Sequence, residues 1–267
     1  MIDKRKITTA RLLEMKKKRQ KITVLTAYDY PTSKILDEVG IDVILVGDSL
    51  GNVILGYENT LPVTVQDMLH HAKAVVHGKK NSMIVVDMPF MSFQSTPEDA
   101  LCNASKFIKE AGAEAVKIEG DLYIDAIRMI VKAGIPVMGH LGFTPQLVNQ
   151  IGGYIVQGKR KSQADLIFKA AKNLQKAGVF SIVLEMVPAK LAKRISGALS
   201  IPTIGIGAGP YCDGQVLVTH DMVGLYNGKT PKYVKQYANL GKALKEAVST
   251  YIWEVQTGKF PKKEHSF

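Results

Sequence analysis

The chain has 267 residues, of which 46% are hydrophobic and 22% charged, so its composition excludes gross disorder and allows a large core. Its formal net charge is +11, but the basic residues are scattered and no nucleic-acid motif accompanies them; we interpret them as solvated surface charge. Two distant cysteines, Cys102 and Cys212, give no disulfide framework, and we find neither a signal-peptide pattern nor a membrane-length apolar run, so we expect a cytoplasmic protein.

Short β-branched runs alternate with longer helical patterns along the chain. The first helical pattern, Thr8–Gln20, precedes every strand and predicts an extra N-terminal helix. Nearly continuous apolar runs such as Val43–Val46 are typical of parallel strands that are buried on both faces. The predicted strands, in chain order, are Ile22–Asp29, Asp42–Asp48, Ser82–Asp87, Ala115–Glu119, Pro136–His140, Ser181–Met186, Pro202–Gly207 and Gln215–His220.

Helical patterns separate most of these strands, and helices that join parallel strands by right-handed crossovers can close a barrel. An open doubly wound sheet would want a Gly-rich phosphate loop after the first strand, where the chain instead has Thr26-Ala27-Tyr28-Asp29-Tyr30. We therefore predict a single (β/α)8 TIM-barrel catalytic domain over residues 1–267, with further helix and a polar tail after residue 231. The predicted helices are Thr32–Val39, Val65–His77, Pro97–Ala111, Ile124–Ala133, Gln163–Ala177 and Lys190–Ala198.

Polar residues stand where the predicted strands end, and active sites of this fold lie at that end of the barrel. Alone, each has an ordinary explanation: a lone Asp often caps a helix or turn, and a lone His is often structural. Together, several carboxylates on one rim would repel each other unless a cation lay among them, so we predict a divalent metal there. These residues are Asp29, Asp48, Ser49, Asp87, Lys117, Glu119, His140, Glu185, the run Gly205–Gly209, His220 and Asp221.

The ligand types indicate which metal. Carboxylates are hard oxygen donors and no Cys or His cluster has zinc spacing, which favours Mg²⁺. Asp48 and Asp87 are the best direct ligands, while Glu119 would bind directly or hold a metal-bound water. Lys117 is two residues from Glu119 on one strand, so the two side chains point the same way. Lys117 would either form a Schiff base with the substrate or stay charged and bind a substrate carboxylate. Surrounding carboxylates favour the charged form, so we prefer the second role.

The chain resembles the ketopantoate hydroxymethyltransferase family over almost its whole length, with the matching stretches in the same order. Asn52 and Ile155 depart from the family pattern, and neither is a residue to which we assign chemistry. The matching stretches are Leu25–Pro31, Asp42–Gly51, Gly56-Tyr57, Thr60–Thr64, Asp87–Phe90, Ala115–Gly120, Gly139–Gly142, Val156–Gly158, Ile201–Gly209, Cys212–Val218 and Glu264–Phe267.

The resemblance implies transfer of a hydroxymethyl group from 5,10-methylenetetrahydrofolate, the co-substrate, to 3-methyl-2-oxobutanoate (α-ketoisovalerate), which gives 2-dehydropantoate on the route to pantothenate and coenzyme A. It implies one Mg²⁺ per subunit, a homodecamer, and small molecules as partners, with no nucleic acid or membrane. It assigns Asp48, Asp87 and Glu119 to metal binding. It assigns Ser49 and Lys117 to substrate binding, together with the same two aspartates. Glu185 would be the general base, and His140 would assist protonation or bind folate.

Three other readings stay open. Another metal-dependent 2-oxo-acid aldolase or lyase on the same fold would share the enolate chemistry without folate, and testing aldehyde acceptors separates the two. A non-catalytic basic assembly for nucleic acid would need lysines on one face and binding that falls steeply with salt. A regulator on an inactive barrel is disfavoured, because every expected polar position is filled.

Overall fold

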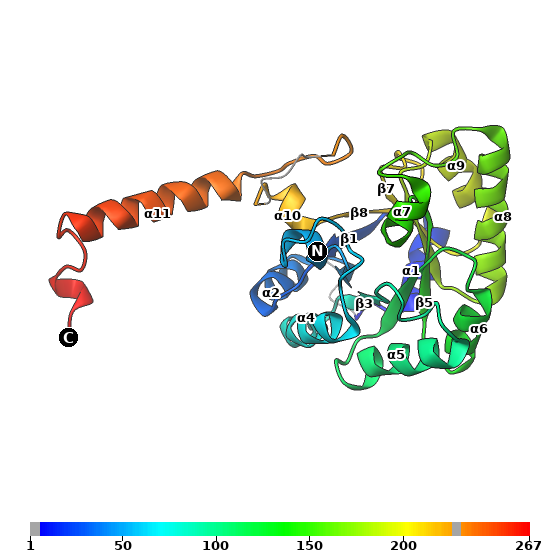
Figure 1. The fold of residues 1–267 in the computed structure, drawn as a ribbon, viewed down its shortest axis with the longest axis horizontal. Helices are drawn as coiled ribbons and strands as arrows, with labels where there is room; N and C mark the ends of the chain where they lie inside the picture. The colour runs from blue at the N-terminus through cyan, green and yellow to red at the C-terminus, as the bar shows by residue number, and fades with distance from the viewer. Residues whose placement is uncertain (1–5, 226–230) are drawn as a thin grey trace. The chain divides into compact units, whose positions relative to one another are not determined.

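The computed structural model describes residues 6–225 and 231–267 and contains a closed barrel of parallel strands in sequence order (Figure 1). Each strand pairs with the next, and β1 closes the barrel on β8. The predicted (β/α)8 barrel is thereby confirmed. The strands are β1 (Ile22–Thr26), β2 (Val43–Val46), β3 (Met83–Asp87), β4 (Ala115–Glu119), β5 (Val137–Gly142), β6 (Ser181–Glu185), β7 (Thr203–Ile206) and β8 (Gly214–Leu217).

Helices surround the strands, and the expected N-terminal helix is present as α1 (Thr9–Lys17), capped by the Thr8 side chain. The Lys16 ammonium lies 2.7 Å from the Asp213 carboxylate, just before β8, so α1 covers the N-terminal end of the barrel. The other helices of this part are α2 (Tyr30–Val39), α3 (Leu50–Val53), α4 (Val65–Gly78), α5 (Pro97–Lys109), α6 (Ile124–Lys132), the 3₁₀ turn η1 (Pro145–Leu147), α7 (Val148–Ile151), α8 (Lys161–Ala177) and α9 (Ala189–Ala198).

The chain divides into two compact units, Met1–Val218 and Thr219–Phe267, and each is described by itself. The second unit contains α10 (Thr219–Met222), α11 (Leu240–Gln256) and the 3₁₀ turn η2 (Lys263–His265). A single domain over residues 1–267 stays a prediction. Within the described residues, no helix has the length and apolarity that crossing a membrane requires.

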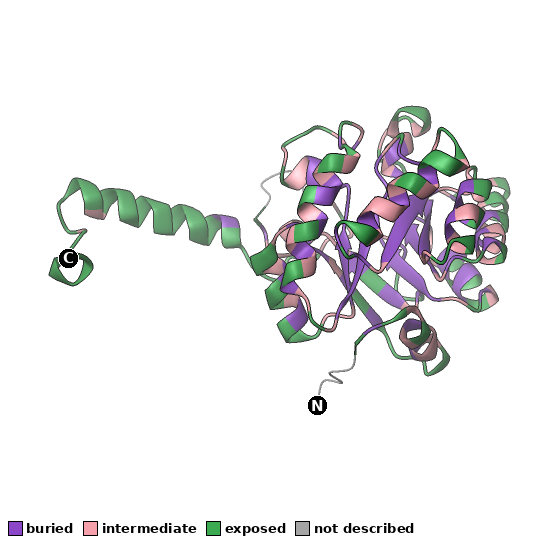
Figure 2. Cartoon of the chain, turned by 90° about the horizontal axis from the view of Figure 1, so that it is seen from below, coloured by how far each residue is buried: buried purple, intermediate pink, exposed green. Residues whose placement is uncertain are grey.

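The hydrophobic core of the first unit lies mainly between the strands and the helices around them, and Figure 2 shows most of the strands buried. Every residue of β2, β3 and β4 is buried, because side chains of a barrel strand point either into the barrel or against the helices. Fully burying a Val, Leu or Ile contributes about 1.5–3 kcal/mol each. The burial of many such residues offsets the free-energy cost of burying two ionisable side chains of β4, Lys117 and Glu119.

Six of the eight predicted strand ends were wrong, four of them by one or two residues and those of β1 and β8 by three. β1 ends at Thr26, and Asp29 is the N-cap of α2, where its Oδ1 accepts a hydrogen bond from Thr32 N at 2.7 Å. β8 ends at Leu217, because the next turn of chain is helical; His220 and Asp221 therefore lie in α10, not at a strand end.

Candidate active site

Strand register gathers the predicted residues at the carboxyl ends of the strands. Asp87 of β3 is the register partner of Lys117 of β4, and Glu119 of β4 is the partner of His140 of β5. Glu185 ends β6, where it pairs with Gly142. Asp48 and Ser49 follow β2 directly. Because all strands are parallel, these ends share one rim of the barrel.

The aspartates and the lysine form one buried group. Asp48 N donates a hydrogen bond to Asp87 Oδ2 at 3.0 Å. Lys117 Nζ lies 2.7 Å from Asp87 Oδ1, with both side chains about nineteen-twentieths buried. The Ser49 hydroxyl lies at the edge of this group, where its Oγ is 2.8 Å from the buried Tyr28 hydroxyl. The Asp87 carboxylate is thus in contact with the Lys117 ammonium and the Asp48 backbone N–H, so three neighbouring strand ends meet here.

The His140 ring connects this group to Glu185. Its Nδ1 lies 3.3 Å from Lys117 Nζ and 3.3 Å from Glu119 Oε1. Its Nε2 lies 3.2 Å from Glu185 Oε2. The seven residues that the sequence singled out for substrate, metal and catalysis therefore lie together at this rim as one cluster, with Ser49 joined to the others through its chain neighbour Asp48.

The backbone around Glu185 is held tightly on both sides. Gly142 has φ +102°, and a Cβ at this position would collide with the Glu185 carbonyl oxygen, which accepts from Phe143 N at 2.8 Å. Met186 has φ +47°, an unusual conformation for a residue with a side chain that costs roughly 1–3 kcal/mol. Its N donates to Ile206 O and its O accepts from Gln157 N, both at 2.9 Å. These contacts fix where the Glu185 side chain begins.

Gln146, in η1, is a site residue that the sequence did not indicate. Its side-chain Nε2 donates to Asp48 Oδ2 and to Met88 O, both at 2.9 Å, and its backbone N donates to Glu119 Oε2 at 3.0 Å. A single buried glutamine thereby holds two carboxylates at the carboxyl ends of two different strands, β2 and β4. Its sequence context, Thr144-Pro145-Gln146, indicates only a break after β5, and no local pattern points to these partners.

The charged side chains of the cluster shift one another's pKa values. Burial, together with the neighbouring Asp87 and Glu119 carboxylates, raises the pKa of Asp48 to about 8. Burial also raises the pKa of Asp87, although Lys117 opposes the shift. For Lys117, burial favours the neutral amine, but the three carboxylates outweigh it and raise its pKa. Burial and Lys117 act to lower the pKa of His140, and the contacts with Glu119 and Glu185 raise it to about 9.

The donor set fits a hard divalent cation. Asp87 Oδ1 and Glu119 Oε1 are buried without a partner in hydrogen-bond geometry, although Lys117 and His140 lie close to them. Among the residues described, no three or more His, Cys, Asp or Glu side chains form a preformed metal group. Mg²⁺ needs no such group, since it is commonly held by one or two carboxylates and completes its shell with water and substrate oxygens.

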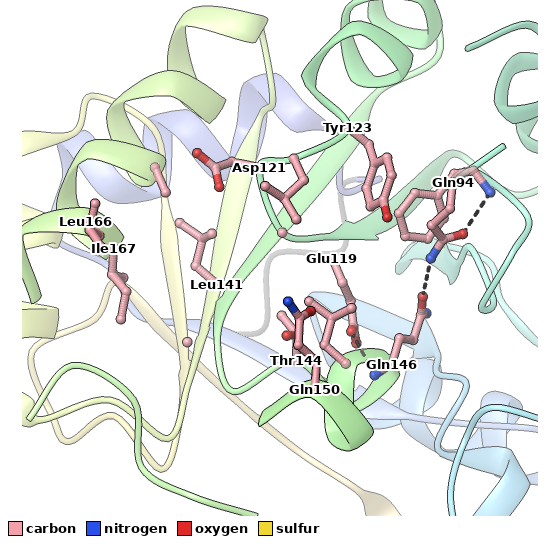
Figure 3. Close-up of a pocket in the computed structure, with 16 residues that line it drawn as sticks. Gln94, Glu119, Asp121, Tyr123, Leu141, Thr144, Gln146, Gln150, Leu166 and Ile167 are labelled. Atoms are coloured by element: carbon pink, nitrogen blue, oxygen red, sulfur yellow. Dashed lines mark hydrogen bonds between the residues drawn. The ribbon is translucent and has the colours of Figure 1, made fainter. Parts of the chain in front are cut away.

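A pocket of about 270 Å³ adjoins the cluster, and we call it the side pocket (Figure 3). It lies between the segments that follow β3, β4 and β5 and the N-terminal half of α8. Glu119 and Gln146 belong both to its lining and to the cluster. The side pocket was not predicted from the sequence.

Comparisons with known proteins agree with this geometry. A family model described as ketopantoate hydroxymethyltransferase matches residues 6–263. The 3-methyl-2-oxobutanoate hydroxymethyltransferase of Thermoanaerobacter sp. (strain X514) is 58% identical over 263 residues, which is 98% of this chain and 96% of that protein. The enzyme of the same name from Syntrophus aciditrophicus (strain SB) is 57% identical over 98% of this chain and 97% of its own length.

A solved structure of phosphonopyruvate hydrolase in complex with oxalate and Mg²⁺ superposes with a TM-score of 0.62 at 10% identity, covering 97% of this chain and 93% of that one. This second likeness is one of fold. The family match and the two relatives extend over nearly the whole chain, which includes every residue of the cluster. The chain therefore belongs to the ketopantoate hydroxymethyltransferase family and is an enzyme of hydroxymethyl transfer to 3-methyl-2-oxobutanoate.

Proposed function

We propose that Glu185 removes the C3 proton of 3-methyl-2-oxobutanoate, and that the resulting enolate attacks a one-carbon unit supplied by 5,10-methylenetetrahydrofolate. Water supplies the hydroxyl oxygen of the product, and tetrahydrofolate is released. The observation that carries this proposal is the continuous cluster from Asp48 and Asp87, through Lys117, to His140 and Glu185. It places a carboxylate base at one end and an anion-binding, metal-binding group at the other. Enolate formation from a 2-oxo acid requires both.

Asp48 and Asp87 would hold Mg²⁺, and Glu119 would bind it directly or through a water molecule. When bound, the metal supplies positive charge against the negative charge that develops on the keto oxygen. Asp87 Oδ1 and Glu119 Oε1 support this assignment, because both are buried and neither has a partner in hydrogen-bond geometry beyond its ionic neighbour, Lys117 or His140. The Gln146 N–H groups keep the Asp48 and Glu119 carboxylates oriented while leaving one oxygen of each for other ligands.

Lys117 and Ser49 would bind the substrate carboxylate. The Lys117 ammonium is held in place by Asp87 and stays charged, so it offers a charge-assisted hydrogen bond. The Ser49 hydroxyl, oriented by Tyr28, offers a second donor. Binding the carboxylate at this end orients C3 of the substrate toward the opposite end of the cluster, where Glu185 lies.

Glu185 would act as the general base and His140 as its partner. His140 Nε2 lies against Glu185 Oε2, and the ring also contacts Glu119, so the ring is fixed between two carboxylates. The raised pKa of His140 keeps its ring protonated, so Glu185 keeps the proton that it takes from C3, and the ring donates a proton to the leaving nitrogen of the folate or to the product alkoxide. We assign His140 to proton transfer in preference to folate binding, because it is buried inside the cluster and is absent from the side-pocket lining.

We further propose a cytoplasmic homo-oligomer, of ten chains as the family resemblance implies. Six exposed large apolar side chains on α11 lie along one face of the helix, which favours a chain–chain interface there. They are Leu240, Leu244, Val248, Tyr251, Ile252 and Val255. The two cysteines, Cys102 and Cys212, are free, and free thiols are usual in the cytoplasm, which supports the proposed location.

Alanine variants of the two aspartates test the metal assignment. A metal that acts as a Lewis acid contributes several kcal/mol to the transition state, so Asp48→Ala or Asp87→Ala should reduce kcat/KM at least about a thousandfold. Calorimetric titration with Mg²⁺ should show that binding is lost too. Asp125→Ala, which removes an exposed carboxylate on α6, is the control. A double aspartate variant that still binds and responds to Mg²⁺ would refute the assignment.

A further inference from the structure

The side pocket is separate from the group that would bind the 2-oxo acid. Its lining includes Glu119 and Gln146, but not Asp48, Asp87 or Lys117. Figure 3 shows Leu166 and Ile167 of α8 across the pocket from Tyr123 and Gln94, with Glu119 between them. The pocket therefore shares Glu119 and Gln146 with the cluster, and its other lining residues lie outside the cluster.

The lining suits a flat ring. Phe93 and Tyr123 pack edge to face, with ring centroids 5.4 Å apart and planes at 84°, and both line the pocket. Leu141 and Ile167 add aliphatic surface. Gln150, an exposed amide at the rim, adds a hydrogen-bond donor and acceptor. Mostly apolar walls with a few polar groups are typical of a site for a ring with a polar edge.

The charge of the pocket argues against a second anion site. Glu119 and Asp121 line it, and no Lys, Arg or His stands among its lining residues, all of which the structure describes. An acidic pocket disfavours a 2-oxo acid but favours a ligand whose edge carries N–H donors, because carboxylates accept hydrogen bonds. A reduced pterin presents such an edge through its amino group and ring N–H groups.

The volume of the side pocket and the residues at its rim fit a ligand with one ring system inside the pocket and a second ring at the rim. A pocket of 270 Å³ lies just below the range of about 300–1,000 Å³ in which whole ligands are usually bound, so it admits a pterin but not a complete folate. At the rim, Leu122 and Leu166 line the pocket and are 72% and 67% exposed. Their free apolar surface would contact the benzoyl ring that follows the pterin.

Glu119 places a ligand in this pocket next to the reaction. It contacts His140, which contacts Glu185, so two side chains separate the pocket from the base. We propose that the side pocket binds the pterin ring of the one-carbon donor; this inference rests on the proposed donor, 5,10-methylenetetrahydrofolate. The one-carbon donor thus enters over the ends of β4 and β5. The carbon that it transfers reaches the enolate from the side of Glu119.

Two matched pairs of variants test the inference. Ala170→Leu adds bulk to the buried wall on α8, whereas Lys169→Leu introduces the same leucine side chain at an exposed neighbour outside the lining. Gln150→Ala removes the rim amide, and Asn149→Ala is its exposed neighbour outside the lining. Calorimetry with tetrahydrofolate should give a dissociation constant raised about tenfold or more for Ala170→Leu, and raised less for Gln150→Ala. The two controls should bind as the wild type does.

A second readout separates this inference from the function beneath it. Exchange of the C3 proton of 3-methyl-2-oxobutanoate in D₂O needs no donor, so Ala170→Leu and Gln150→Ala should exchange at wild-type rates. Wild-type tetrahydrofolate affinity in both variants would overturn the pocket assignment alone. A wild-type enzyme that exchanges the proton, but neither binds tetrahydrofolate nor uses its methylene derivative, would overturn the proposed donor together with the pocket.

Discussion

Gln146 shows how one neutral residue can organise a charged site. Its three N–H···O contacts join Asp48, Met88 and Glu119, which lie on separate strand-end segments. A methionine is similar in size but has no amide to donate. Loss of a hydrogen bond behind a metal ligand typically weakens metal binding about 10- to 100-fold, and we expect this for Gln146→Met.

Mg²⁺ titration of the variant provides the measurement, and Asn149→Leu, at an exposed position on α7, provides the control. The Gln146→Met protein should regain most of its turnover at saturating Mg²⁺, which a general loss of folding would not allow. Unchanged Mg²⁺ affinity would show that Gln146 only fills space.

For Lys117, the sequence left two roles open, Schiff-base formation and binding of the substrate carboxylate, and the structure favours the second. Its contacts with Asp87 and its raised pKa keep the ammonium charged, and a charged amine does not attack a carbonyl. Borohydride added with 3-methyl-2-oxobutanoate should therefore leave no covalent adduct, as mass spectrometry of the intact chain would show. An adduct on Lys117 would restore the Schiff-base interpretation.

At the scale of the elements, Asp37 of α2 secures the start of β3. It is buried, and its Oδ1 accepts from Asn81 N at 2.8 Å and Ser82 N at 2.7 Å. Asp37→Ala would leave two N–H groups without this acceptor, at a cost of about 1–3 kcal/mol each. Chemical denaturation should show that loss, whereas Glu38→Ala, at an exposed neighbour, should change stability little.

The same residue predicts a pH dependence. Burial opposes the shift, but the backbone donors outweigh it and lower the pKa of Asp37 below its ordinary value. Its stabilising effect is then complete above the unfolded pKa of about 3.9 and is lost as pH falls through the lower, folded value. The stability gap between wild type and Asp37→Ala should narrow below pH of about 4; a gap that widens on acidification would contradict this account.

The sequence predicts elements better than it predicts their ends. Buried strands such as β2 are recognisable because continuous apolar runs suit a sheet that is covered on both faces. The ends of β1 and β8 are harder to recognise from the sequence. Asp29 and His220 follow apolar runs, yet Asp29 caps the next helix and His220 lies within the next helix. Gln146 and the side pocket depend on contacts between residues far apart in the chain, for which one sequence carries no local signal.

At the scale of the whole molecule, the exposed apolar face of α11 sets the expectation for assembly. A stable interface needs roughly 1,200 Å² or more of buried surface, and apolar helix faces commonly supply it. Val248→Glu puts a charge on this face, while Thr250→Glu puts the same charge on the opposite side of the exposed helix. Sedimentation equilibrium should give a multiple-chain mass, ten chains by our proposal, that falls only for Val248→Glu. A monomeric wild type would refute the assembly.

Proton exchange at C3 of 3-methyl-2-oxobutanoate, followed by NMR in D₂O with Mg²⁺ and without a folate, tests the mechanism most directly. The wild type should exchange this proton. Glu185→Gln should bind Mg²⁺ and the 2-oxo acid with near wild-type affinity but exchange it at least about a hundredfold more slowly, since a positioned base contributes about 10²–10⁴-fold. Exchange at the wild-type rate in Glu185→Gln would contradict the account, because the base would then lie elsewhere.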